Sequence, residues 1–334
     1  MRRFMIKDLE ITNFKSIKHL NLNCRKINLC IGEPNTGKSN ILEALGLFSL
    51  FKYGSRQIRD SVRMESMTDL FHEENLDEKL TIRADDYVFD IIFENSRFMG
   101  RCHKKSQDQI VQFSFDYDDM GSGSSSVIQE PFPIKFYKFS PIKSSHRPEA
   151  DFLLPPSGEN LYTLLRTHKK LRDEATQLFE PFKLKLVFRH PESKIEIMEQ
   201  HEDLFITYPY SLVSDTLQRI VFYVAAIDSN KDSILVFEEP ESHTFPYYTK
   251  SLGEKIALDE RNQYFIATHN PYLLLAILEK AKKDSVRVFI TYLEDYQTKI
   301  KCLTDSQISE LMNYDPFFNL KEFIEGNIRD SNRM

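Results

Sequence analysis

A glycine-containing segment constrains the fold of this chain more than any other part of the sequence. Residues 32–39 read Gly-Glu-Pro-Asn-Thr-Gly-Lys-Ser, which fits the P-loop pattern G-x4-G-K-[ST]. An apolar stretch typical of a buried strand precedes it at residues 27–31, and residues 41–51 have the apolar spacing of a helix. Such a loop points backbone N–H groups at a phosphate, and the helix adds its positive amino end. The segment therefore predicts an α/β fold that binds a nucleotide.

The pattern also predicts a role for the side chains of the loop. We expect the Lys38 ammonium to neutralise the phosphates of ATP and the Ser39 hydroxyl to bind Mg²⁺. A glycine turn that merely precedes Lys-Ser is the alternative, and chance would produce the pattern in about one chain in a hundred of this length. The predicted nucleotide-binding residues are Gly32, Asn35, Thr36, Gly37, Lys38, Ser39 and Asn40.

Two later segments place polar side chains directly after apolar strands. Residues 234–237 are apolar and are followed by Glu238 and Glu239. In such a pair the first carboxylate can hold Mg²⁺, and the second can polarise the water that attacks the γ-phosphate. His269 follows a second apolar strand at residues 264–267, within reach of a phosphate bound on the neighbouring loop. The ordinary alternatives are a solvated acidic strand end and a structural histidine.

A serine before a helix is the last candidate site residue. Ser214 precedes a segment that stays helical in pattern through residues 221–226. Serine at a helix start is usually an N-cap. The functional alternative is that Ser214 and the amino end of the helix contact a phosphate bound by a second subunit.

The rest of the chain divides by its patterns. Strands and helices alternate in the last third, which predicts a mainly parallel sheet. Charge rises and short alternating segments appear over residues 51–140, which predicts a small β-rich lobe. Residues 121–126 (GSGSSS) have the composition of a flexible loop, and residues 161–179 have the stripe of one amphipathic helix. We predict one head, with a nucleotide-binding core at 1–50 and 215–334 and an insertion at about 51–214.

Composition and charge limit the classes of partner, metal site and compartment that we expect for this protein. The net charge of −6 argues against a globally basic nucleic-acid binder, although a local basic face of Lys15, Lys18, Arg25 and Lys26 stays open. No apolar run approaches the ~18 residues of a membrane span. The four cysteines form no CxxC pair, so a zinc site is not expected. We expect a cytoplasmic protein with reduced thiols and no membrane contact.

In this order, the motifs resemble those of the ABC-type P-loop ATPases, most closely the branch of RecF, the SMC proteins, their zinc-hook relatives and the overcoming-lysogenization-defect proteins. Residues 9–16 (LEITNFKS) look like the first strand and corner of that branch, and residues 137–161 also resemble it. The resemblance implies an α/β P-loop NTPase with an ABC-ATPase-like head, in which helices flank a mixed central sheet and a β-rich and helical insertion lobe is added.

The resemblance also implies roles and an assembly. Ser39 and Glu238 would hold Mg²⁺, Glu239 would be the catalytic carboxylate, His269 the switch histidine and Ser214 the signature serine. Two subunits of this family clamp two ATP molecules head to tail, which makes a homodimer the expected state and a higher oligomer the alternative.

Two departures from the family pattern stand out. Glu238 replaces the usual Asp, so the metal-binding carboxylate is one methylene longer. The signature segment has no glycine, because none occurs between Gly158 and Gly253. Close approach to a partner's phosphate is harder without glycine.

Three functions fit these observations. The first is an ATP-hydrolysing dimeric switch that controls a partner effector encoded nearby, as in the stand-alone ATPase subunits of two-gene bacterial anti-phage systems. It is favoured because only 65 residues follow His269, too few for a Toprim nuclease domain. The second is a RecF-like ATPase that repairs or clamps DNA. The third is a nucleotide-gated sensor with negligible hydrolysis.

Overall fold

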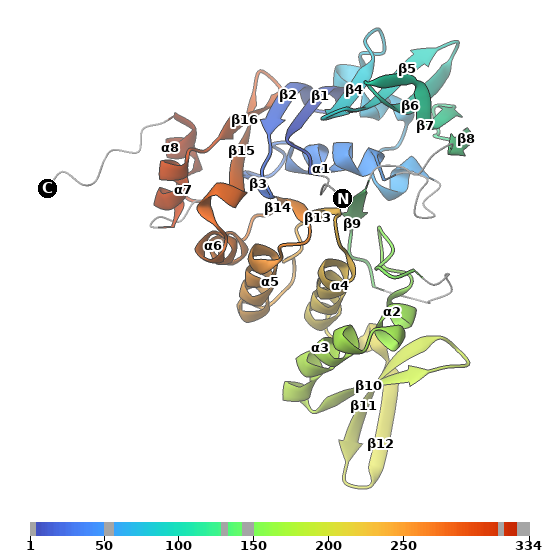
Figure 1. Ribbon diagram of the computed structural model, residues 1–334, viewed down its shortest axis with the longest axis vertical. Helices are drawn as coiled ribbons and strands as arrows, with labels where there is room; N and C mark the ends of the chain where they lie inside the picture. Colours follow the sequence, from blue (N-terminus) through green and yellow to red (C-terminus); the bar gives the residue numbers. More distant parts are fainter. Residues whose placement is uncertain (1–4, 50–56, 128–132, 142–149, 313–316, 326–334) are drawn as a thin grey trace, which may run out of the picture.

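The computed structural model describes residues 5–49, 57–127, 133–141, 150–312 and 317–325 (Figure 1). A six-stranded sheet lies at the centre, in the order β16-β15-β3-β14-β13-β9. Neighbouring strands are parallel except for the antiparallel pair β15 and β16, so the predicted mixed central sheet is confirmed. The strands are β3 (Ile27–Gly32), β9 (Ile134–Tyr137), β13 (Ile234–Glu238), β14 (Gln263–Ala267), β15 (Val286–Glu294) and β16 (Gln297–Cys302).

Side chains on the central strands alternate between two faces and enter two separate cores. On one face, Val236 and Phe265 are buried with the helix that follows the P-loop. On the other face, Phe237 and Ile266 are buried with three later helices, which lie side by side in Figure 1. The helices are α1 (Lys38–Leu47) on the first face and α4 (Asp215–Ser229), α5 (Pro246–Leu258) and α6 (Pro271–Lys280) on the second. Helix α1 begins three residues before the helix predicted over 41–51 and ends at Leu47; residues 50 and 51 of that prediction lie outside the described residues.

A second, antiparallel sheet covers α1. Its order is β2-β1-β4-β5-β6-β7-β8, so the first two strands of the chain belong to this sheet and not to the central one. The pairing of Ile11 with Ile82 makes the junction, and the β-rich lobe is larger than the sequence predicts. Its strands are β1 (Asp8–Phe14), β2 (Ile17–Asn23), β4 (Leu80–Ala84), β5 (Tyr87–Glu94), β6 (Arg97–Lys104), β7 (Gln107–Tyr117) and β8 (Gly123–Val127).

The prediction of a flexible loop at residues 121–126 is wrong for most of that segment. Ser124, Ser125 and Ser126 form the edge strand β8, which pairs with β7 through the backbone. Composition suggested a loop because serine and glycine have low strand propensity, but a paired neighbour overrides that preference.

A helical lobe follows, and its first part is broken where one helix was predicted. Helices α2 (Leu161–Thr167) and α3 (Lys169–Phe179) meet at His168, whose φ of −101° and ψ of 95° are not helical. Leu164 and Leu171, on either side of the break, still enter the same core, which is why the apolar stripe gave no sign of it. The three-stranded sheet of β10 (Leu184–Arg189), β11 (Lys194–His201) and β12 (Leu204–Pro209) then projects away from the body (Figure 1).

The short helices α7 (Asp305–Leu311) and α8 (Leu320–Glu325) end the described chain. Among the described residues, no helix combines the length and apolar character needed to cross a membrane. The division into a core and an insertion at about 51–214 stays a prediction.

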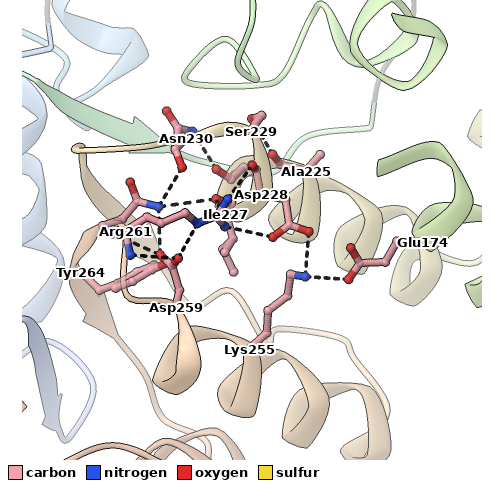
Figure 2. A network of polar contacts seen from close by, with 12 residues as sticks. Glu174, Ala225, Ile227, Asp228, Ser229, Asn230, Lys255, Asp259, Arg261 and Tyr264 are labelled. Carbon is pink, nitrogen blue, oxygen red and sulfur yellow. Dashed lines mark hydrogen bonds and ion pairs between the residues drawn. The ribbon is translucent and has the colours of Figure 1, made fainter. Parts of the chain in front are cut away.

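A network of charged side chains joins the helices at the end of the central sheet away from the P-loop (Figure 2). Lys255 of α5 lies 2.6 Å from a carboxylate oxygen of Glu174 in α3 and 2.7 Å from one of Asp228 in α4. Arg261 continues the network, 3.1 Å from Asp228 and 2.8 Å from Asp259. The helical lobe is therefore connected to the core by ion pairs as well as by apolar packing.

Asp259 is the most buried carboxylate of this network, with 7% of the residue exposed. Burial opposes its ionisation, but hydrogen bonds from Tyr264, Arg261 and Asn262 hold the pKa of Asp259 below its ordinary value. A depressed carboxylate pKa adds stability above the unfolded-state pKa of about 3.9, and this stability is lost as pH falls through the folded-state value.

We therefore predict that Asp259→Asn lowers the free energy of unfolding by about 1–3 kcal/mol at pH 7, because hydrogen bonds to a charged group are lost. The difference from wild type should shrink below about pH 4. Urea unfolding at several pH values measures both effects. Glu260→Gln is the control, since that neighbouring side chain is 79% exposed. An equal cost for both variants would contradict the prediction.

Candidate nucleotide site

The P-loop between β3 and α1 is held closely against the β15–β16 hairpin. A Cβ atom at Gly32 would lie 2.4 Å from the carbonyl oxygen of Thr291, and one at Gly37 would lie 2.1 Å from Oγ1 of Thr298. Both glycines also have positive φ, at 152° and 91°. The glycines of the motif are therefore required by packing and by backbone conformation at once.

The side chain of Lys38 folds back over the loop. Its Nζ atom donates to the carbonyl oxygens of Gly32 at 3.0 Å and Glu33 at 2.7 Å. Burial lowers the pKa of Lys38 to about 8, although the nearby charge of Glu239 opposes the shift. A buried ammonium whose hydrogen-bond partners are neutral carbonyls is short of negative charge, so this loop fits an anion such as the phosphates of ATP.

Other predicted nucleotide-binding residues shape the loop. The Thr36 hydroxyl donates to the carbonyl oxygen of Glu33 at 2.8 Å and lies 2.6 Å from Oγ1 of Thr291. The Asn40 amide donates to Oγ of Ser16 at 2.7 Å, which ties α1 to the turn after β1. Asn35 has a φ of 60°, in the left-handed region that Asn tolerates. Ser39 occupies the second position of α1.

The two carboxylates and the histidine lie at the same edge of the central sheet as the P-loop. Strands β13, β14 and β3 are parallel neighbours, so their carboxyl ends coincide. Nε2 of His269 lies 3.0 Å from a carboxylate oxygen of Glu239. Burial and the charge of Lys38 lower the pKa of His269, while Glu239 opposes the shift, so the imidazole is mainly neutral at pH 7. The structure therefore brings Lys38, Glu239 and His269 into electrostatic contact.

Glu238, the predicted metal ligand, is engaged by a residue that the sequence did not single out. Nη2 of Arg63 lies 2.9 Å from a carboxylate oxygen of Glu238, and Nε of Arg63 lies 2.9 Å from Glu43. Glu43 is 1% exposed and also pairs with Lys15 at 2.5 Å. No motif pointed to Arg63; Glu43 is visible in the sequence only as the one charged residue in the otherwise apolar segment 41–48.

Ser214 takes the ordinary role in this structure. It is the N-cap of α4, and its hydroxyl accepts a hydrogen bond from the backbone N–H of Leu217 at 3.4 Å. The Thr216 hydroxyl donates to the carbonyl oxygen of His243 at 2.9 Å, which fixes the first turn of α4 beside the loop after β13. Contact with a second subunit's phosphate stays a prediction.

The candidate basic face is largely used within the chain. Lys15 pairs with Glu43, and Lys26 donates to the carbonyl oxygen of Asp259. Arg25 lies 3.1 Å from Asp305. Among these four residues, Lys18 is exposed and the other three are partly buried. These contacts favour structural roles for three of the four residues.

A cavity of about 700 Å³ lies on the antiparallel sheet and not at the P-loop. Its lining includes Asp90, Arg101 and Ser114, which come from β5, β6 and β7. Two of its charged side chains are already paired, because Asp90 accepts from the Thr81 hydroxyl at 2.7 Å and Asp116 lies 2.7 Å from Arg97. The chemistry of the P-loop edge, rather than cavity volume, locates the candidate site.

Two family models match this chain. The model described as "AAA ATPase domain" matches residues 5–146, and the one described as "AAA domain, putative AbiEii toxin, Type IV TA system" matches residues 141–276. Together they span the P-loop, both carboxylates and His269. The search of curated proteins found no match.

A solved SMC head shows the same fold. An SMC head bound to the C-winged helix domain of ScpA is 15% identical, with a TM-score of 0.52, and the match covers 92% of this chain and 100% of that one. The SMC head domain from Thermotoga maritima is 14% identical, with a TM-score of 0.41, over 90% of this chain and 100% of that one. The fold comparison rests on the first structure.

The matching ATPase models, the SMC-head fold and the P-loop geometry agree with one another. Residues 5–146 and 141–276 each match an AAA-type ATPase domain, and the chain has the P-loop fold seen in an SMC head.

Proposed function

We propose that this protein binds and hydrolyses Mg-ATP between two copies of the chain, and that its nucleotide state controls a partner effector. The observation that carries the proposal is the pairing of Glu239 with His269 beside Lys38. The three side chains supply a cation for phosphate, a carboxylate for water and an imidazole that senses the phosphate end.

Each residue has a distinct role in this proposal. Lys38 and the P-loop backbone bind the phosphates, and Ser39 and Glu238 hold Mg²⁺, which supplies positive charge to the phosphate oxygens. The Glu239 carboxylate orients and deprotonates the attacking water. It is itself oriented from two sides, by His269 and by the Ser242 hydroxyl, which donates to Oε2 at 3.0 Å. A base held in one orientation reaches the reacting water without a conformational search.

Three observations support the dimer and the partner. Ser214 begins α4 at the P-loop edge, where a second subunit's phosphate can be met by its hydroxyl and the helix amino end. The SMC head of similar fold was solved with a domain of ScpA bound to it. The second family model is named for a toxin of a type IV toxin–antitoxin system, which is compatible with a role in bacterial anti-phage defence.

A second function, the nucleotide-gated sensor, is favoured by one contact. Arg63 occupies a carboxylate oxygen of Glu238, the residue proposed for Mg²⁺. A guanidinium at that position competes with the metal for the same negative charge. Slow hydrolysis with tight ATP binding would follow if the Arg63–Glu238 ion pair stays formed after the nucleotide binds. The contacts of Lys15, Arg25 and Lys26 within the chain do not favour the RecF-like function.

Replacement of the proposed base and of the P-loop lysine tests hydrolysis directly. Glu239→Gln should keep ATP binding and lower kcat by about a hundredfold to ten-thousandfold, because general-base catalysis is lost. Lys38→Ala should weaken ATP binding by about tenfold or more, because a charge-assisted contact is removed. Phosphate release and equilibrium binding measure the two effects, with Glu260→Gln as control. Wild-type turnover at background with tight ATP binding would select the sensor instead.

The low pKa of Lys38 predicts how ATP affinity depends on pH. Only the protonated ammonium attracts phosphate, so the dissociation constant should rise as pH passes 8, by about tenfold per pH unit until the bound-state pKa is reached. Calorimetric titration between pH 7 and 9.5 measures this change. Lys38→Arg should show no such dependence, because the guanidinium stays charged. A flat wild-type profile would contradict the prediction.

Removal of the guanidinium tests its competition with Mg²⁺. Arg63→Ala should lower the Mg²⁺ concentration for half-maximal ATP binding by about two- to fivefold, the strength of a part-exposed ion pair. A fluorescent nucleotide titrated with Mg²⁺ gives this concentration. Arg83→Ala is the matched control, since Arg83 makes a similar 2.8 Å pair with Glu10 in the antiparallel sheet. A higher Mg²⁺ requirement in Arg63→Ala would show that Arg63 assists the bound nucleotide.

A further inference from the structure

A third carboxylate lies beneath the proposed catalytic pair, and the sequence patterns gave it no role. Glu241 follows Glu239 by two residues, but its residue is only 4% exposed. Glu239 has a φ of 43°, and the backbone turns over residues 240–243, just after β13. The side chain of Glu241 then reaches the segment that follows β14.

One oxygen of Glu241 holds that segment. Oε1 accepts a hydrogen bond from the Thr268 hydroxyl at 2.5 Å and one from the backbone N–H of His269 at 3.3 Å. Oγ1 of Thr268 in turn accepts from the backbone N–H of Asn270 at 3.0 Å. Three consecutive residues after β14 are therefore fixed, directly or through one hydroxyl, by a single carboxylate.

The arrangement is costly, which indicates a purpose beyond filling space. A buried carboxylate loses its hydration, and Oε2 of Glu241 has no hydrogen-bond partner among the described residues. Burial, together with the charge of Glu239, raises the pKa of Glu241 to about 7. The compensation for this burial is the two hydrogen bonds that Oε1 of Glu241 accepts. They are stronger than neutral hydrogen bonds whenever the carboxylate is ionised.

The two carboxylates hold the histidine at different points. Glu239 contacts the imidazole at 3.0 Å, and Glu241 contacts the backbone N–H of the same residue. The backbone N–H of Glu239 also donates to the carbonyl oxygen of Ala267 at 2.9 Å, so a backbone hydrogen bond joins the ends of β13 and β14. We propose that Glu241 is a positioning residue that fixes the Thr268–His269 backbone and so holds the His269 imidazole against Glu239. The catalytic consequence rests on the proposed ATPase function.

The experiment compares Glu241→Ala and Thr268→Val with the conservative variant Thr268→Ser. The first two should lower kcat for Mg-ATP by about tenfold to a hundredfold, as expected for loss of a hydrogen bond to a charged group. Their KM should stay within about twofold, because the P-loop is a separate element. Thr268→Ser keeps the hydroxyl and should retain most of the wild-type kcat.

Asp259→Asn is the matched control. It removes a carboxylate of similar burial, 7% exposed, at the opposite end of the central sheet. It should cost stability without changing kcat per folded molecule. A fall in kcat no larger in Glu241→Ala than in Asp259→Asn, or an equal rise in KM, would overturn the positioning role.

A second readout separates this inference from the ATPase proposal. In nucleotide-free protein, the amide proton of His269 should exchange with solvent at least about tenfold faster in Glu241→Ala than in wild type, because its acceptor is gone. Asp259→Asn should leave this exchange rate unchanged when it is compared with wild type under conditions in which the two proteins have equal global stability. Unchanged exchange in Glu241→Ala overturns the inference, whether or not the wild type hydrolyses ATP. Faster exchange in Glu241→Ala, together with no ATP turnover by the wild type, upholds the positioning role of Glu241 and rejects the proposed ATP hydrolysis.

Discussion

The parallel pairing of β3, β14 and β13 is the constraint on which the rest of this molecule depends. Ala267 is paired with Cys30 on one side and with Glu238 on the other, so three strands end at one edge. The P-loop, the acidic pair and His269 meet because each directly follows one of these strands. A shift of one residue in either register would turn every side chain of the strand to the other face, exchanging the two cores and moving the polar ends out of reach.

Buried charge is distributed unequally between the two ends of this sheet. At the end away from the P-loop, Asp259 and Lys255 are surrounded by complementary partners, and that network stabilises the contact with the helical lobe (Figure 2). At the P-loop edge, Lys38 and Glu241 are buried without enough opposite charge around them. Burial therefore lowers the pKa of Lys38 and raises the pKa of Glu241. Uncompensated charge at one edge is the arrangement expected where a ligand supplies the missing partner.

Two further sheets lie around the central sheet. The antiparallel sheet covers α1 and includes the first two strands of the chain, so the P-loop helix lies between two sheets. The boundary between the matching family models falls near residue 141, just after β9 at the edge of the central sheet. The core is therefore continuous across both matches, whereas the three-stranded sheet of β10–β12 extends from it (Figure 1).

The sequence alone determined the elements whose signals are local: the P-loop, the apolar strands, the pair Glu238 and Glu239, and His269. Each is recognised from spacing within a few residues, because a strand end or a loop constrains its immediate neighbours. Tertiary structure decided the contacts between distant residues, since Arg63 and Glu238 are separated by 175 positions and Thr268 and Glu241 by 27. It also decided that GSGSSS pairs as a strand and that a helix breaks at His168, because backbone pairing and bending leave no fixed pattern in side-chain type.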